Sequence, residues 1–136
     1  MYVEKRKHQR LAIKLKTRID CENGFSIEGK TKNISFGGVF FEPDSDSIIS
    51  DRIKNNDVCT LTLLLNNDDA ANQIPLIFQI RVAHCRKRGY GMQFLFIEGL
   101  EAYEHFEKMM VLNSDASESL MAELEKHPGL IVKDEN

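Results

Sequence analysis

Hydrophobic and polar residues alternate along the first part of the chain. Between Leu11 and Cys21, apolar or small side chains occupy the odd positions, and charged side chains occupy the even positions from Lys14 to Asp20. A period of two residues is typical of a half-buried β-strand. Asn23-Gly24 follows, a pair that tolerates the positive φ angles of a tight hairpin turn. The pattern therefore predicts a strand over 11–21, a turn, and a second strand over about 25–33.

Similar patterns recur as far as Phe96. A tight corner is expected at 35–38, polar loops at 42–57 and 66–72, and a turn at Arg88-Gly89. Four further strands are expected. The first begins at Val39, and the others cover Val58–Leu65, Ile74–Arg86 and Tyr90–Phe96. Six strands at hairpin-like intervals, with no helix between them, predict a mainly β fold: a six-stranded antiparallel barrel.

The period changes after Ile97. Apolar residues then recur every three or four positions, at Leu100, Tyr103, Phe106 and Met110. This spacing predicts an amphipathic helix that packs on the barrel. The expected organisation is a flexible basic arm (1–10), a barrel (11–97), a C-terminal helix (98–113) and an acidic tail (114–136).

The tail contains a second, shorter pattern. Ser114 or Asp115 is a candidate N-cap for a helix that carries Leu120 and Leu124. His127-Pro128-Gly129 should end that helix. We expect the residues after this stop to be mobile.

Composition and charge narrow the functional classes. The chain has 136 residues, 42% of them hydrophobic and 29% charged, which suits one globular domain. Its net charge of -3 is unevenly distributed. Residues 1–20 carry +5 and residues 98–136 carry -7. The basic end suits an anionic partner, whereas the acidic end argues against general nucleic-acid coating.

The cysteines point to a reducing compartment. Cys21, Cys59 and Cys85 are an odd number without C-x-x-C spacing, and each lies in a predicted strand. This favours reduced, packed thiols over disulfides or a zinc site. No apolar run is long enough to span a membrane, and no apolar segment follows the N-terminal charges. We therefore expect a cytoplasmic protein without membrane insertion.

Two short motifs carry the chemistry. Arg6-Lys7-His8-Gln9-Arg10 supplies two guanidinium groups, and Asn33-Ile34-Ser35-Phe36-Gly37-Gly38 follows after 22 intervening residues. The second motif offers an amide, a hydroxyl and a glycine turn. Arginine can bind phosphate bidentately and can also match the O6 and N7 atoms of guanine.

In this order, R-x-x-x-R followed by N-x-S-x-x-G resembles the two-part signature of the PilZ domain, a bacterial family whose usual role is to sense cyclic di-GMP. The resemblance extends to the Gly89-Tyr90-Gly91 turn and to the C-terminal helix, and it covers roughly residues 3–112. It implies that five residues bind cyclic di-GMP: Arg6, Arg10, Asn33, Ser35 and Gly38. Many family members have Asp in place of Asn33.

Four neighbours are possible accessory residues. Lys5 is the best candidate for an extra phosphate contact, Gln9 lies inside the first motif, and Gly37 adds freedom to the turn. For His84, a strand-end position without a ligand role is the favoured interpretation, and stacking on a base is the alternative. A glycine at position 38 leaves room where ligand and backbone must meet.

The leading hypothesis is a cyclic di-GMP receptor whose arm becomes ordered on binding and which signals through contact with an unidentified protein. The resemblance implies a partner in motility, adhesion (biofilm) or secretion. One alternative is an adaptor of the same fold that binds no nucleotide; another is a barrel that binds single-stranded nucleic acid. We expect no enzyme and no cofactor, because the sequence has neither a catalytic motif nor metal-ligand spacing. The ligand could bind as one molecule or as a stacked pair.

Overall fold

The computed structural model describes residues 9–44, 53–65, 74–86, 88–114, 117–126 and 130–133. Arg6 and Lys5, much of both polar loops, and the His127-Pro128-Gly129 stop lie outside these residues. Three of the strands pair antiparallel in sequence order: β4 (Val58–Leu65), β5 (Ile74–Arg86) and β6 (Gly89–Glu98).

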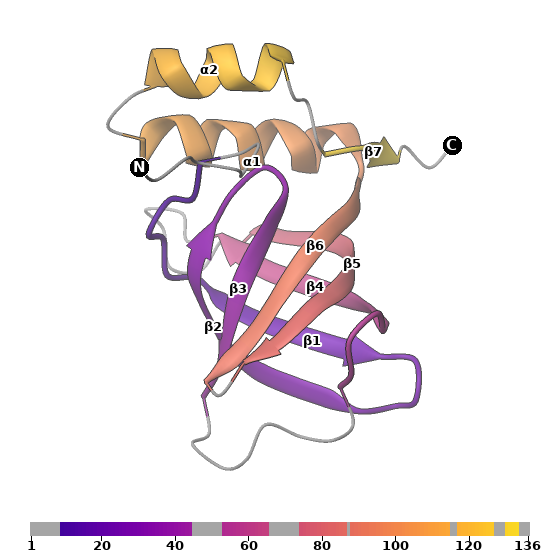
Figure 1. Ribbon diagram of the computed structural model, residues 1–136. Helices are drawn as coiled ribbons and strands as arrows, with labels where there is room; N and C mark the ends of the chain where they lie inside the picture. Colours follow the sequence, from indigo (N-terminus) through magenta and orange to yellow (C-terminus); the bar gives the residue numbers. More distant parts are fainter. Residues whose placement is uncertain are drawn as a thin grey trace.

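The sheet closes into a barrel. The remaining barrel strands are β1 (Lys16–Cys21), β2 (Ser26–Ile34) and β3 (Gly38–Pro43). Neighbouring strands follow the order β3-β2-β1-β4-β5-β6, and β3 also pairs with β6 in antiparallel register. The predicted six-stranded antiparallel barrel is therefore confirmed (Figure 1).

Alternating side chains fill the barrel. In β4, every second residue from Cys59 to Leu65 is buried, and β5 buries Leu76, Phe78, Ile80 and Val82 in the same way. In β5 these are residues that the period of two placed on one face. Burial of these large apolar side chains supplies the main driving force for folding.

The first strand is shorter than the sequence suggests. The alternation predicted a strand from Leu11, but β1 begins at Lys16, and Leu11 makes only an isolated bridge to Ile34. The hydroxyl of Thr31 explains the difference. It accepts a hydrogen bond from the Leu15 amide (2.9 Å) and donates one to the Ile13 carbonyl (2.6 Å). These two side-chain hydrogen bonds replace the backbone hydrogen bonds that would otherwise extend the pairing of β1 with β2.

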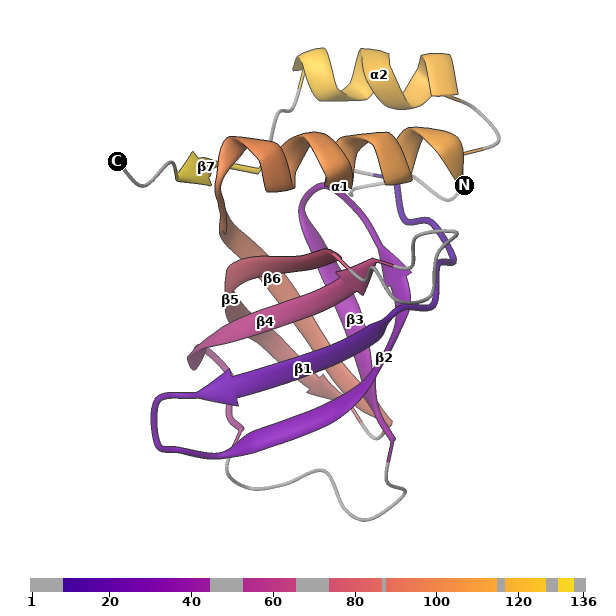
Figure 2. The same cartoon turned by 180° about the vertical axis from the view of Figure 1, so that it is seen from behind.

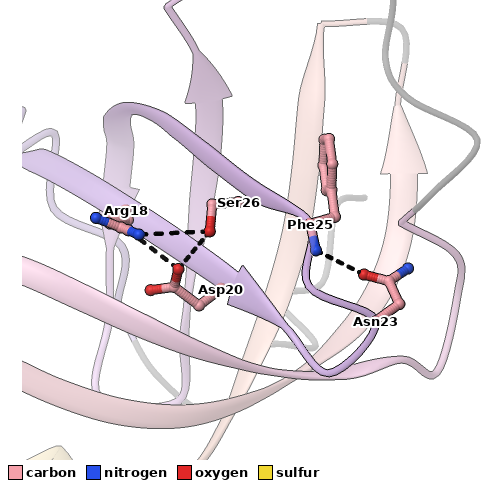
Figure 3. Close-up of polar contacts among 5 residues, drawn as sticks. All are labelled: Arg18, Asp20, Asn23, Phe25 and Ser26. Atoms are coloured by element: carbon pink, nitrogen blue, oxygen red, sulfur yellow. Dashed lines mark hydrogen bonds and ion pairs between the residues drawn. The ribbon is translucent and has the colours of Figure 1, made fainter.

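The β1–β2 hairpin turns at Asn23-Gly24, as predicted. Gly24 has a φ of 90°, which few other residues adopt readily, and the Asn23 side chain accepts a hydrogen bond from the Phe25 amide (2.9 Å). Nearby, Arg18 contacts Asp20 at 3.0 Å on the outer face of the hairpin (Figure 3).

Helix α1 (Leu100–Leu112) covers one end of the barrel (Figure 1). Gly99, with a φ of 95°, turns the chain from β6 into this helix. Phe106 and Met110 are fully buried, as the helical spacing predicted. Leu100 was expected in the same stripe, but it is 53% exposed, because it begins the helix beyond the edge of the barrel.

Phe106 is the centre of an aromatic cluster. Its ring lies edge-on to three others, with centroid distances of 5.4 Å to Phe36, 5.3 Å to Phe78 and 5.9 Å to Phe94. Edge-to-face arrangements of this kind stabilise aromatic cores beyond their buried area. The cluster fastens α1 to both the β2–β3 corner and the barrel wall.

The tail is ordered further than expected. A second helix, α2 (Ser117–Lys126), buries Leu120 and lies over α1 (Figures 1 and 2). The prediction of mobile residues after 129 was wrong for 130–133, where Leu130 is buried and β7 (Val132–Lys133) pairs with β6 in parallel. This short strand occupies the edge of β6 that β3 leaves free beyond Gln93.

All three cysteines are free thiols. Cys21 and Cys59 lie opposite each other on β1 and β4, with their sulfur atoms 3.3 Å apart. Burial, the hydrogen bond with Cys21 and nearby negative charge raise the pKa of Cys59 to about 12. Cys85 was expected to be packed, but it is exposed because it lies near the end of β5.

The Phe106→Ala substitution tests how strongly α1 is fastened to the barrel. We expect the free energy of unfolding, measured by urea denaturation, to fall by about 3–5 kcal/mol, because a large buried ring leaves a cavity among three others. Leu112→Ala on the same helix is the matched control. Leu112 is 74% exposed, so its loss should change stability by less than about 0.5 kcal/mol. Equal effects of the two substitutions would contradict this packing.

Candidate functional site

A cleft of about 480 Å³ opens on the side of the barrel. Its walls come from the β2–β3 corner (residues 35–38), the start of β3, the end of β5 and the middle of β6. Arg10 lies at its edge. This volume lies within the range of pockets that hold small-molecule ligands.

Ser35 shapes the corner. Its hydroxyl accepts hydrogen bonds from the amides of Gly37 and Gly38, each at 3.1 Å, and its own amide donates to the Gly38 carbonyl at 2.8 Å. Ser35 is only 7% exposed. In this state the hydroxyl therefore holds the turn, whereas the sequence argument gave it a direct role in ligand or arginine contact.

Gly38 is required by the closure of the barrel. A Cβ atom at this position would lie 2.2 Å from the carbonyl oxygen of Met92 on β6, far inside van der Waals contact. From the sequence, glycine was expected at this position because it leaves room for a ligand to approach the backbone. The structure adds a second reason, since backbone of β6 already occupies the space beside it.

Asn33 precedes the corner on β2, and its side chain is half-buried in the wall of the cleft. Within the described part of the chain, its amide group has no hydrogen-bond partner. An amide carries both donors and an acceptor, so Asn33 can bind a polar ligand edge without first breaking an internal contact.

The two sequence motifs meet at one pair of residues. The Leu11 amide donates to the Ile34 carbonyl at 2.8 Å, and the Ile34 amide donates to the Leu11 carbonyl at 2.9 Å. Leu11 follows Arg10 directly, and Ile34 stands between Asn33 and Ser35. The pair therefore brings Arg10 beside the second motif, although 22 residues separate the motifs in sequence.

His84 forms the opposite wall of the cleft. It lies directly across from Gly91 in the β5–β6 hairpin, and its ring covers that glycine so closely that a Cβ atom there would be 2.2 Å from Nε2. Burial of the ring, then the positive charges of Arg86 and Arg10, lower the pKa of His84 below its ordinary value of 6.5. The imidazole is therefore neutral at pH 7 and presents an aromatic surface.

The cleft is electropositive. The guanidinium of Arg10 makes no ion pair with any residue that the structure describes, and it is exposed to solvent. The Lys32 ammonium lies 6.0 Å from the centre of the ring of Phe40, a residue that lines the cleft. Positive charge at the edge of a pocket attracts anionic ligands.

Six residues named from the sequence line this cleft: Arg10, Asn33, Ser35, Gly37, Gly38 and His84. Gln9 is described but is not part of its wall, and Arg6 and Lys5 lie outside the described residues. Gly91 and Phe40 were not predicted as site residues. Gly91 could have been found by counting outward from the Arg88-Gly89 turn, because the hairpin register pairs it with His84.

The described residues contain no cluster of His, Cys, Asp or Glu side chains that could hold a metal ion. Among the helices in the described ranges, none is both long and apolar enough to cross a membrane.

The PilZ domain family model matches residues 4–109. The chain belongs to the PilZ domain family. Both sequence motifs and α1 lie within or largely within the matched range, as the resemblance implied. PilZ domains form a family of cyclic di-GMP receptors and adaptors.

Two solved structures share the PilZ fold at low sequence identity. The Bacillus subtilis inhibitor of motility, MotI/DgrA, has a TM-score of 0.60 and 16% identity, over 83% of this chain and 54% of that one. The PilZ domain of CeSA from a cellulose-synthesising bacterium has a TM-score of 0.55 and 15% identity, over 78% and 99% of the two chains. This PilZ domain thus spans about half the length of MotI/DgrA. No functionally curated protein matches the sequence significantly.

The placement of Arg10 near His84 can be tested by titration. We expect NMR of the histidine rings, assigned with His84→Gln, to give His84 a pKa below 6.5. Arg86→Gln should raise this pKa, and Arg10→Gln should raise it by less, because each removes a repulsive charge. Since the unfolded chain protonates more readily at this residue, His84 should lower stability as the pH falls below about 6.5.

Arg18→Gln is the control, because Arg18 lies on the β1–β2 hairpin and pairs with Asp20. An unshifted His84, or a pKa that does not respond to Arg10→Gln, would contradict the arrangement of the cleft.

Proposed function

We propose that this PilZ domain is a receptor for cyclic di-GMP and that the cleft beside the β2–β3 corner is its binding site. The observation that supports this most is the reciprocal pair of hydrogen bonds between Leu11 and Ile34. This pair holds Arg10, whose guanidinium makes no ion pair with any described residue, against the amide, hydroxyl and glycines of the second motif. The chain segment that ends the first motif at Arg10 and the wall of the cleft thus form one surface.

The chemistry of the ligand fits this surface. Cyclic di-GMP has two phosphates and two guanines, so it needs cations together with groups that recognise guanine edges. Arg10 supplies a planar fork that binds either a phosphate or guanine O6 and N7, and Arg6 supplies a second fork from the arm. Asn33 hydrogen-bonds a guanine edge with its side-chain amide.

His84 acts as a stacking surface for a base. The ring is neutral because its pKa is lowered, and it is held over Gly91, so it offers a flat face without the cost of desolvating a charge. Stacking on an aromatic ring is tolerant of base identity, so His84 contributes affinity while Arg10 and Asn33 contribute selectivity.

Binding of cyclic di-GMP orders the N-terminal arm, and the ordered arm is the signal that a partner protein detects. Lys5, Arg6 and Gln9 close over the phosphates and change the surface next to the cleft. A partner protein reads this surface, and the motility function in the name of MotI/DgrA makes a motility component a reasonable class of partner. The receptor works in the cytoplasm, without a cofactor and without catalytic activity of its own.

Calorimetric titration with cyclic di-GMP tests the proposal, with GMP and cyclic di-AMP as controls. We expect selective, saturable binding with a dissociation constant of about 1 μM or lower, which corresponds to roughly -8 kcal/mol. The same titration gives the stoichiometry, one molecule or a stacked pair. Absence of binding at two temperatures by a folded protein would favour an adaptor that binds no nucleotide.

Arg10→Ala should weaken this binding by about tenfold or more, because a charge-assisted hydrogen bond contributes roughly 1.5–3 kcal/mol. Arg18→Ala is the matched control and should bind like the wild type, since Arg18 lies outside the cleft. An Arg10→Ala protein that is folded and binds with unchanged affinity would refute the role of Arg10. Binding that weakens steeply with salt and ignores the nucleotide would instead indicate a nucleic-acid-binding surface.

A further inference from the structure

The arm is joined to the barrel through residues 11–15, which we call the arm root. This segment leaves the sheet between the Leu11–Ile34 bridge and the start of β1 at Lys16. The sheet ladder alone therefore does not determine its path. Arg10 immediately precedes the root, so the position of its guanidinium depends on how firmly the root is held.

Thr31 holds the root from the inside. Its side chain is only 1% exposed, and its hydroxyl uses both hydrogen-bonding functions: it accepts from the Leu15 amide and donates to the Ile13 carbonyl. Its own amide also donates to the Leu15 carbonyl at 3.0 Å. One residue of β2 thus satisfies three backbone groups of the root.

Thr31 also lies close to the second motif along β2. The pairing of β2 with β3 shifts between Thr31 and Asn33, which is a β-bulge, and the two residues pair with Phe41 and Phe40. Bulges redirect the side chains that follow them and are common next to functional sites. The same stretch of β2 therefore fixes the root on one side and presents Asn33 to the cleft on the other.

We infer that Thr31 is a positioning residue for the cyclic di-GMP site, acting through the arm root on Arg10. This rests on the proposed function of the cleft. Thr31 does not line the cleft, and its effect comes from holding Arg10 where the ligand needs it. A loosened root leaves only a fraction of molecules competent to bind, and the apparent affinity falls by that fraction.

Thr31→Val is the decisive substitution, because it keeps the size and branching of the side chain and removes the hydroxyl. Trypsin cleavage after Lys14 should become roughly tenfold faster or more, since two hydrogen bonds that oppose opening of the root are lost. The dissociation constant for cyclic di-GMP should rise at least about threefold. Thr31→Ser restores the hydroxyl and should recover most of both properties.

Thr60→Val is the matched control. The Thr60 hydroxyl accepts a hydrogen bond from the Gln79 side chain at 2.9 Å, between β4 and β5 and away from the root. It should change neither the cleavage after Lys14 nor the affinity, even if it lowers the melting temperature by a similar amount. This comparison separates a positional effect from a general loss of stability.

Two results would overturn the inference. One is a Thr31→Val protein whose root is cleaved no faster than in the wild type. The other is a loosened root with wild-type affinity for cyclic di-GMP. If the wild type itself binds no cyclic di-GMP, the proposed function fails and the ligand part of this inference fails with it, whereas the cleavage assay still reports whether Thr31 anchors the root.

Discussion

The close approach of β3 to β6 is the constraint on which the rest of this molecule depends. At Gly38 the two backbones are so near that even a methyl group would collide with the Met92 carbonyl. This approach allows β3 to pair with both β2 and β6 and so closes the sheet into a barrel. Closure removes the free sheet edges that would otherwise remain on these strands.

Closure also builds the cleft. The Gly37 carbonyl accepts a hydrogen bond from the Phe94 amide at 2.9 Å, so the corner is tied to β6 on both sides of Gly38. Phe36 points from the same corner into the aromatic cluster around Phe106. The corner is therefore held by the sheet, by its own Ser35 hydroxyl and by α1, and this rigidity suits a surface that must recognise a ligand.

The sequence predicts the barrel best in the strands where buried and less buried residues alternate regularly. The bounds of β4 and β5 agree with the prediction because every second residue is buried along most of each strand and polar segments follow both strands. The start of β1 could not be predicted, since it is set by the hydroxyl of Thr31, a residue distant in sequence. Likewise, β7 depends on the edge that β3 leaves free on β6, and no local pattern in two residues can show this.

For the candidate site, the motifs named residues that line the cleft, but they gave only part of the physical reasons why those residue types are needed there. Arg10 and Asn33 both line one cleft. The need for glycine at position 38 also comes from a distant backbone, and the contact of His84 with Gly91 depends on hairpin register. These long-range contacts become visible only when the strands are assembled.

The central claim is that the arm and the corner form one binding site for cyclic di-GMP. Amide chemical-shift mapping by NMR, during titration of the isotope-labelled protein with this ligand, tests it most directly. The account predicts that the largest shifts fall on Arg10, Gly37, Gly38 and Gly91, while the Asn23-Gly24 turn stays unchanged. Shifts confined to α1 and α2, or no shifts from a folded protein at saturating ligand, would contradict it.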